Sequence, residues 1–334
     1  MKFAAILLGI ATVLGATAAR AGCTLDAVAN LPVRVEDGRI FLSGSVNGHP
    51  LDFLVNPAYR SVMLNAASLD LDMSSFKQVR TVLGYDKPDL PFGIMNEGPD
   101  RVVLDQSFYV VKGSVRDFGL PGAVAMLGAD ILDRFDLEFD LAHNLLILYR
   151  PSSDCATVQE GYWDRRAAVA DMVRGLNAAS NAEPFDAFNF PFVTLRAKVN
   201  GQSVRAIIDA GQRHSSLSLT AAHQFGVDRD NLTEIEATPD LFDGYSHRTW
   251  YGDFGKVSLG GETISPAWLR VRSFEAPPTA PARTGSLVRD TLLYEGGMVL
   301  GADFLITHRV LFSFSQHKVY FTAAGDRPYL GKEM

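Results

Sequence analysis

The chain has 334 residues, of which 47% are hydrophobic and 21% are charged, and its formal net charge is -7. This length allows one large or two medium folding units with a sizeable core, and the composition excludes wholesale disorder. The acidic balance, without a long basic run, excludes nucleic acid as an expected partner and favours solubility instead.

Residues 1–21 have the pattern of a secretory signal peptide. Lys2 supplies a positive end, the apolar stretch 3–14 follows, and Ala19–Ala21 fits a small-x-small cleavage site, so we expect a mature chain from residue 22. An uncleaved anchor is the alternative, but the apolar stretch is shorter than the ~20 residues that span a bilayer. No later segment is long and apolar enough to span one either. We therefore expect a secreted protein in the periplasm of a Gram-negative-type bacterium.

The chain has two cysteines, Cys23 and Cys155, which stand before and just after the first of two sequence repeats. In an oxidising compartment they can pair, and a disulfide that closes so long a loop is worth ~4 kcal/mol by chain entropy. Two free thiols are the alternative. Lipidation of Cys23 is disfavoured because Arg20 stands where such signals carry an aliphatic residue.

Residues 22–150 form the first expected lobe, which short alternating runs predict to be rich in strands. Asn47-Gly48 lies between two such runs and is a strong hairpin signal. A short helix is expected over residues 66–71, and Thr81–Tyr85 is a candidate hairpin tip. The expected strands are 40–42, 51–55, 101–104, 108–111 and 145–149.

Residues 151–189 read as a linker between lobes. The segment 162–179 is rich in Ala and Arg with helical spacing, so we expect one helix there.

Residues 190–334 form the second expected lobe, and they repeat the first. Residues 193–209 align with residues 40–56 without a gap, which places Asn200-Gly201 over Asn47-Gly48 and Asp209 over Asn56. Later, 300–305 repeats 127–132. A duplication of this size predicts two similar lobes rather than a solenoid. If the lobes face each other, residues 56 and 209 meet.

Asp209 ends an apolar strand and precedes Ala210-Gly211, an arrangement that taken alone is typical of a turn. The wider pattern resembles the retropepsin-like (gag-polyprotein-type) aspartic proteases, in the bacterial form with two lobes in one chain. The resemblance rests on Ile207–Gly211, Ser215–Leu217 and Val299–Leu305, and it covers both lobes. It implies two small closed β-barrels, one per lobe, with a peptide-binding cleft between them.

In that family two catalytic aspartates about 3 Å apart share one proton. Asp209 matches one of them and Gly211 matches the family glycine, whereas Ala210 replaces a threonine or serine. The other aspartate is replaced by Asn56, which can donate a hydrogen bond but cannot take and return a proton. We therefore expect Asp209 to be ionised near neutral pH.

The first lobe departs from the family pattern at two further positions. Pro57 replaces the threonine and lacks both a hydroxyl and a backbone N–H, and Ala58 replaces the glycine and is expected to crowd the turn. Gly128 and Gly301 are expected to pack behind the two loops. Tyr85 and Tyr245 lie in candidate hairpin tips over the cleft. The residues expected to line the centre or the cleft are Pro57, Ala58, Tyr85, Ala210, Gly211, Ser215 and Tyr245.

Asp130 and Asp303 occupy equivalent places in the two lobes, where each is expected to cap a short helix. The histidines show no metal-ligand spacing, and neither a metal nor a cofactor is expected. The resemblance therefore predicts a catalytically degenerate protein that binds peptide or protein in the cleft. An active aspartic endopeptidase that uses Asp209 by an altered mechanism is the alternative, and the oligomeric state stays open.

Overall fold

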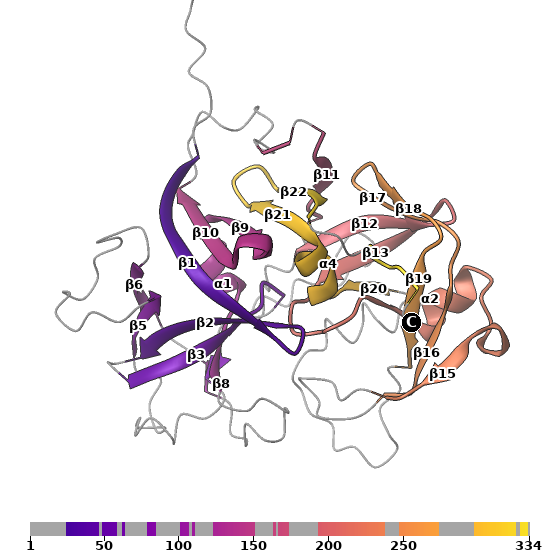
Figure 1. Cartoon of the computed structure of the whole chain (residues 1–334), viewed down its shortest axis with the longest axis horizontal. Helices are drawn as coiled ribbons and strands as arrows, with labels where there is room; N and C mark the ends of the chain where they lie inside the picture. The colour runs from indigo at the N-terminus through magenta and orange to yellow at the C-terminus, as the bar shows by residue number, and fades with distance from the viewer. Residues whose placement is uncertain are drawn as a thin grey trace, which may run out of the picture.

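The fold was obtained as a computed structural model that describes residues 25–46, 49–58, 62–63, 79–84, 101–106, 109–110, 123–150, 163–164, 166–173, 193–237, 247–273, 297–324 and 328–332. Strands dominate these residues, and they form two lobes that lie side by side (Figure 1). The prediction of a mostly β fold with an internal duplication is confirmed.

In the part of the chain that the structure describes, the first lobe has short strands, one short helix and one 3-10 turn. These are Asp26–Glu36 (β1), Arg39–Val46 (β2), His49–Val55 (β3), Val62–Met63 (β4), Val79–Gly84 (β5), Arg101–Gln106 (β6), Tyr109–Val110 (β7), Ala123–Leu127 (β8), Ala129–Leu132 (α1), Asp136–Asp140 (β9), Leu141–His143 (η3) and Leu145–Arg150 (β10).

The second lobe has the same character. It consists of Thr194–Val199 (β12), Gln202–Ile208 (β13), Ser216–Ser218 (β14), Leu219–Gln224 (α2), Arg229–Asn231 (η7), Thr233–Ile235 (β15), Thr249–Asp253 (β16), Val257–Leu259 (β17), Glu262–Ile264 (β18), Trp268–Arg272 (β19), Gly297–Leu300 (β20), Ala302–Thr307 (α4), His308–Ser313 (β21) and Lys318–Ala323 (β22). Along the chain, strand Ala168–Asp171 (β11) lies between the two lobes.

The two lobes use the same strand pairing around their central loops. In the first lobe β3 pairs in parallel with β8, and Val55 lies opposite Leu127. In the second lobe β13 pairs in parallel with β20, and Ile208 lies opposite Leu300. Each parallel pair is therefore followed by one of the two aligned residues, Asn56 or Asp209. The second-lobe turn Asn200-Gly201 has both φ angles positive (48° and 85°), as a two-residue hairpin turn requires.

A shared sheet joins the lobes, in the order β11-β22-β21-β9-β10-β1. Strands β9 and β21 pair antiparallel across the lobe boundary, with Glu138 opposite Leu311. The same displacement that carries Leu127 to Leu300 also carries residue 138 to residue 311, so these two residues are equivalent in the repeat. A residue that pairs with its own repeat lies at a twofold axis between the lobes.

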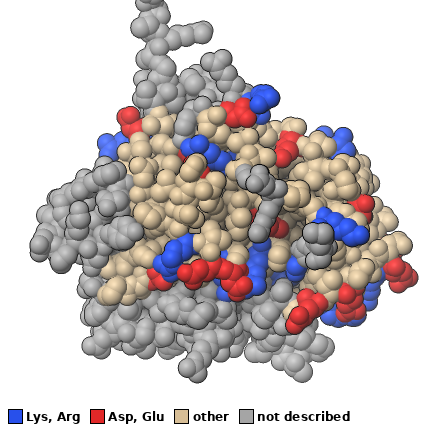
Figure 2. All heavy atoms as spheres, in the orientation of Figure 1, with Lys and Arg blue, Asp and Glu red and all other residues tan. Residues whose placement is uncertain are grey.

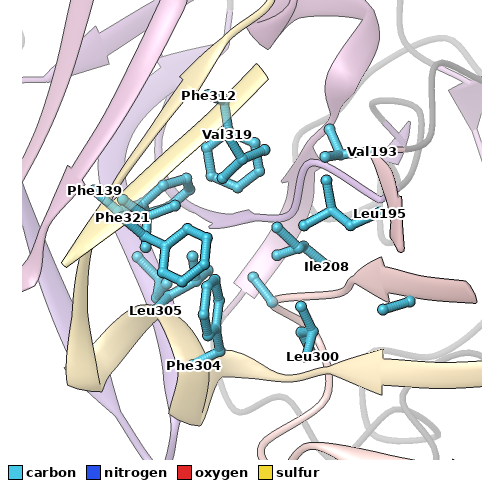
Figure 3. Packing of buried hydrophobic residues seen from close by; sticks show 14 of the residues in the cluster. Phe139, Val193, Leu195, Ile208, Leu300, Phe304, Leu305, Phe312, Val319 and Phe321 are labelled. Atoms are coloured by element: carbon cyan, nitrogen blue, oxygen red, sulfur yellow. The ribbon is translucent and has the colours of Figure 1, made fainter. Parts of the chain in front are cut away.

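One hydrophobic core runs through both lobes, because buried residues from each belong to the same cluster. At the boundary the rings of Phe139 and Phe312 meet edge to face, with their centroids 5.5 Å apart. Figure 3 shows these rings beside Phe304 and Phe321, with Ile208 and Leu300 of the second lobe close by. The lobes are thus joined by backbone pairing of β9 with β21 and by packing of aromatic side chains from the same two strands.

The prediction of closed barrels is wrong for the described strands. The second-lobe sheet runs β15-β16-β19-β14-β20-β13-β12-β17-β18 and does not return to its first strand. The last strands of each repeat, β9 with β10 and β21 with β22, enter the shared sheet instead. Strands β9 and β21 therefore form hydrogen bonds with each other across the lobe boundary and not with strands that would close a barrel within one lobe.

The helix predicted over residues 162–179 is also wrong where the structure describes it. Residues 168–171 form strand β11, which pairs antiparallel with β22. The helix expected over residues 66–71 lies outside the described residues. Among the described helices, none has the length and apolar character needed to cross a membrane.

The charged surface is mixed. On the face that Figure 2 shows, basic and acidic side chains lie interspersed rather than gathered into a field of one sign.

Candidate functional site

The structure brings Asn56 and Asp209 into direct contact at the boundary between the lobes. The Asn56 amide nitrogen Nδ2 donates a hydrogen bond of 2.8 Å to Oδ1 of Asp209. Their exposed fractions are 0% and 1%. The carboxylate thus lies out of water, and an amide from the other lobe is bonded to it.

Both loops are held in the same way. The backbone N–H groups of Asn56 and Asp209 each donate at 2.9 Å to the carbonyl of the paired strand, that of Leu127 in one lobe and that of Leu300 in the other. The sequence repeat is therefore also a repeat of the hydrogen bonds that set the direction of each loop.

The turns after the two residues also match. Ala58 N–H donates at 3.0 Å to Oδ1 of Asn56, and Gly211 N–H donates at 3.0 Å to Oδ1 of Asp209. The expected crowding by Ala58 does not occur. Neither Ala58 nor Gly211 is among the described residues with positive φ, so this turn does not need glycine.

These bonds define what the centre can do chemically. Asn56 uses its amide oxygen toward Ala58 and its amide nitrogen toward Asp209, so the two bonds fix its orientation. Oδ1 of Asp209 accepts from two N–H donors, the Asn56 amide and the Gly211 backbone. A carboxyl pair would share a proton here, whereas the amide donates its hydrogen without exchanging it. Pro57 and Ala210 are buried beside the pair, and neither has a hydroxyl to link the two loops.

Gly301 and Gly128 begin the short helices behind the loops, at the N-cap positions of α4 and α1. A Cβ atom on Gly301 would lie 2.6 Å from the backbone carbonyl carbon of His214 and 2.8 Å from the carbonyl oxygen of Gln212. Only glycine allows the loop after Asp209 to approach the helix this closely. The approach is used, because Ala302 N–H donates at 2.7 Å to the Gln212 carbonyl.

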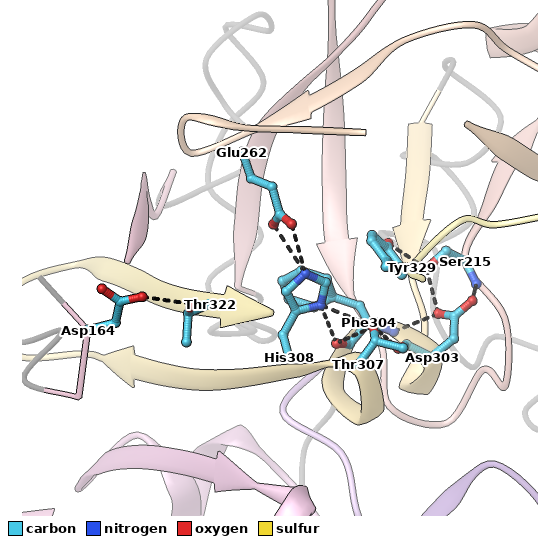
Figure 4. A network of polar contacts seen from close by, with 9 residues as sticks. All are labelled: Asp164, Ser215, Glu262, Asp303, Phe304, Thr307, His308, Thr322 and Tyr329. Atoms are coloured by element: carbon cyan, nitrogen blue, oxygen red, sulfur yellow. Dashed lines mark hydrogen bonds and ion pairs between the residues drawn. The ribbon is translucent and has the colours of Figure 1, made fainter. Parts of the chain in front are cut away.

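Ser215 ties the same loop to α4 and to the C-terminal segment (Figure 4). Its hydroxyl donates at 2.6 Å to Oδ1 of Asp303, and its backbone N–H donates at 2.7 Å to Oδ2. The Ser215 hydroxyl also accepts from Gly301 N–H at 2.9 Å and lies 2.8 Å from the hydroxyl of Tyr329. Ser215 therefore holds the back of the loop rather than facing Asp209 in any described contact.

The prediction that Asp303 caps a short helix is confirmed in part, because its Oδ1 accepts at 2.8 Å from Phe304 N–H in the first turn of α4. The side chain of Asp130 lies outside the described residues. The N-cap residues are Gly128 and Gly301, neither of which makes a side-chain cap bond. Asp303 lies in the first turn, and its carboxylate turns toward the loop because two donors from Ser215 are available there.

Burial controls the electrostatics of this network. It raises the pKa of Asp303 from 3.8 to about 6, against the opposing effect of its hydrogen bonds from Ser215 and Phe304. Burial, followed by the nearby charge of Asp303, raises the pKa of Tyr329 well above its usual value.

A second buried polar pair lies one residue beyond Gly211. Nη1 of Arg272 donates at 2.6 Å to Oε1 of Gln212, and both side chains are buried. Pattern reasoning missed Gln212, Arg272 and Tyr329, because nothing in their local sequence marks them. The one available signal was that Gln212 follows the Asp-Ala-Gly motif directly.

Several predicted residues cannot be placed. Tyr85, Tyr245, Cys23 and Cys155 lie outside the described residues, so their roles and the disulfide stay predictions. Thr81–Gly84 lies in β5, which pairs with β6 as a hairpin arm. Within the described segments, no group of three or more His, Cys, Asp or Glu side chains is placed to hold a metal ion.

No protein-family model and no curated protein matches the chain. Among solved structures it is similar to basic 7S globulin from soybean, at 12% identity and a TM-score of 0.40, over 90% of this chain and 96% of that one. It is also similar to edgp, at 10% identity and a TM-score of 0.43, over 90% of this chain and 95% of that one. A third similar structure is an aspartic proteinase from Irpex lacteus, at 10% identity and a TM-score of 0.42, over 88% of this chain and 96% of that one. TM-scores this low are too small for these likenesses to bear on the function.

Proposed function

We propose that this protein is an exported, catalytically degenerate member of the aspartic-protease fold that binds an extended peptide or a protein segment between its lobes. The observation that carries the proposal is the buried hydrogen bond of 2.8 Å from Asn56 to Asp209. It occupies the place where two carboxyl groups would share a proton.

General acid–base hydrolysis of a peptide needs one group that takes a proton from water and one that gives a proton to the carbonyl or leaving group. Asp209 is suited to the first task. Asn56 cannot perform the second by proton transfer, and its amide hydrogen is already donated to Asp209. Loss of one member of a catalytic unit costs several orders of magnitude in rate. Binding survives such a loss, because it depends on the shape and polarity of the surface around the centre.

One observation favours the alternative, an active peptidase of altered mechanism. The Ala58 turn reproduces the hydrogen bond of the Gly211 turn, so the lobe-1 loop retains its geometry despite three substitutions. In this alternative Asp209 draws a proton from water while Asn56 donates a hydrogen bond to the carbonyl of the substrate. The Asn56 amide would then have to leave Asp209 during each turnover.

A cleavage assay separates the two functions. The mature chain and its Asp209→Ala variant are incubated with denatured protein from about pH 3 to pH 7, the range over which carboxyl groups titrate. We expect neither protein to cut. Cleavage by the wild type that disappears in the variant would overturn the degenerate function and establish the alternative.

A binding assay tests the positive half of the proposal. Peptides retained by the immobilised mature chain from a digest of denatured protein are sequenced, synthesised and titrated by fluorescence anisotropy. Asp209→Ala should weaken their binding about tenfold, the worth of one charge-assisted hydrogen bond. The matched control Asp230→Ala, at an exposed position in η7, should leave it unchanged. Failure to retain any peptide, or equal loss in both variants, would contradict peptide binding at the centre.

The export part of the proposal is supported by Lys2, the apolar stretch 3–14 and the small residues at 19 and 21. Fractionation of cells that express the full chain should place it in the periplasm, and sequencing of its N-terminus should begin near Gly22. A cytoplasmic protein that keeps residues 1–21 would refute this part alone.

A further inference from the structure

A cavity of about 490 Å³ lies at the lobe boundary, behind the loop that carries Asp209. Its lining comes from residues 35, 37 and 38 of the first lobe, the loop 213–215, strands β16 and β19, helix α4 and the C-terminal residues 328–331. Neither Asn56 nor Asp209 lines it. Its volume falls within the roughly 300–1,000 Å³ typical of sites for small organic ligands.

One wall of the cavity is aromatic. Tyr251 and Trp268 stack with their ring centroids 5.4 Å apart and an interplanar angle of 28°. The C-terminal segment fixes this wall, because the Tyr251 hydroxyl donates at 2.9 Å to the Gly331 carbonyl and the backbone N–H of Trp268 donates at 2.8 Å to the Leu330 carbonyl. A rigid pair of this kind offers a flat apolar surface without an ordering cost on binding.

Two basic residues also line the cavity, and one of them, Arg270, lies on the same strand as Trp268 and opposite Tyr251 in the pairing of β16 with β19. Arg213 and Arg270 both line the cavity, and they are close enough for Arg270 to lower the pKa of Arg213, an effect second to that of burial. Arg213 forms an ion pair with Asp37 at the hairpin tip of the first lobe, where 64% of the Asp37 side chain is exposed. So exposed a pair contributes little, and a ligand carboxylate can join or replace it. Lys332 adds a third positive charge, with Nζ 4.9 Å from the centre of the Trp268 ring.

Two acidic residues, Asp37 and Asp303, also line the cavity. Asp37 pairs with Arg213. The oxygens of Asp303 accept hydrogen bonds from Ser215 and from Phe304 N–H. Burial raises the Asp303 pKa, and the charge of Arg270 is among the effects that lower it. With Lys332 the site has three positive groups beside these two acids. An anion bound between Arg213 and Arg270 would offset the mutual repulsion of these two like charges.

We infer that this cavity is a second binding site, separate from the Asp209 centre, for a flat apolar carboxylate. The carboxylate lies between the guanidinium groups of Arg213 and Arg270, which match its planar geometry, and the ring packs against Tyr251 and Trp268. Such chemistry occurs in a free aromatic acid and in the C-terminal aromatic residue of a peptide.

Isothermal titration calorimetry on the mature chain tests this inference with two matched pairs of probes. One pair is 3-phenylpropionate and 3-phenylpropionamide. The other is the tripeptide Ala-Ala-Phe with a free C-terminal carboxylate and with a C-terminal amide. Both carboxylates should bind saturably and more tightly than their amides. Tighter binding of the free acid assigns the site to small acids, and tighter binding of the tripeptide assigns it to peptide C-termini.

Variants locate the binding. Arg270→Gln should weaken the carboxylates about tenfold or more, as loss of a charge-assisted hydrogen bond does. Arg196→Gln, an exposed position on β12, should not change their affinity. If Arg270→Gln lowers the thermal unfolding midpoint strongly, Arg213→Gln takes its place.

Three results would overturn the inference: no saturable binding up to ~10 mM, where affinities become too weak to be specific, amides that bind as well as carboxylates, or arginine variants that bind as well as the wild type. None of these results bears on peptide binding at Asp209, because neither Asn56 nor Asp209 lines the cavity.

Discussion

Replacement of Asn56 by aspartate tests the geometry of the centre directly. The amide nitrogen lies 2.8 Å from Oδ1 of Asp209, so a carboxylate oxygen would take nearly the same place. Two full charges at that distance repel by up to about 6 kcal/mol at an effective dielectric constant of about 20, which corresponds to ~4 pKa units. The Asn56→Asp protein should therefore keep one proton between residues 56 and 209 at neutral pH.

This shared proton makes stability depend on pH with a known sign. The folded pair holds a proton that the unfolded chain releases above about pH 4, so the pKa of the pair is raised by folding. The free energy of unfolding of Asn56→Asp, relative to wild type, should then fall as the pH rises from about 4.5. The expected slope is about 1.4 kcal/mol per pH unit until the pair loses its proton. Urea unfolding followed by tryptophan fluorescence, repeated across this range, measures the slope.

The matched control exchanges the two side chains. Asn56→Asp combined with Asp209→Asn restores one acid and one amide, so its difference from wild type should not vary with pH. If Asn56→Asp alone has the same pH profile as wild type, residues 56 and 209 do not touch, and the reasoning about the centre fails.

Three further predictions concern the support of the central loop and of the boundary between the lobes. The pKa of Asp303 is raised to about 6, so ionisation of its carboxyl should cost the wild type about 3 kcal/mol as the pH rises from about 4 to 6.5. Asp303→Asn should not show this loss in the same urea series, and parallel curves would contradict the burial of the charge. Gly301→Ala should destabilise by about 2 kcal/mol or more, because its Cβ would lie 2.6 Å from His214 backbone. An unchanged thermal midpoint would refute the close approach. Arg309→Met leaves the fully buried Glu138 without its ion pair and should cost about 3 kcal/mol. Combination with Glu138→Leu should recover most of that loss, and an additive double variant would show that the two groups are independent.

The internal duplication of the sequence is by itself enough to predict much of the fold. Residues 40–56 and 193–209 share an apolar strand, an Asn-Gly turn and a second apolar strand, and such local patterns adopt the same structure in both copies. Two equal lobes related by a twofold axis then place residues 56 and 209 opposite each other, which is where the structure has them. The predicted strand at residues 145–149 is present as β10, since period-2 alternation is a local property of the chain.

Local patterns failed wherever a distant partner decided the outcome. Residues 168–171 favour a helix by composition, but β22 offers a free hydrogen-bonding edge and the segment pairs with it as a strand. Helix propensities differ by only ~0.5 kcal/mol per residue among ordinary residues, so a row of backbone hydrogen bonds overrides them.

Only the tertiary structure decided how the lobes join and what supports the central loop. Strands β9 and β21 pair with each other across the lobe boundary, whereas a closed barrel would need them to pair within their own lobes. The alternation of apolar residues along a strand is the same in both arrangements, so the sequence does not distinguish them. The carboxylate of Asp303 accepts from Ser215, which is 88 residues away in the chain, as well as from Phe304 N–H in its own helix. Such contacts depend on where folding brings separate segments together, because a polar side chain bonds to whichever donor is buried beside it.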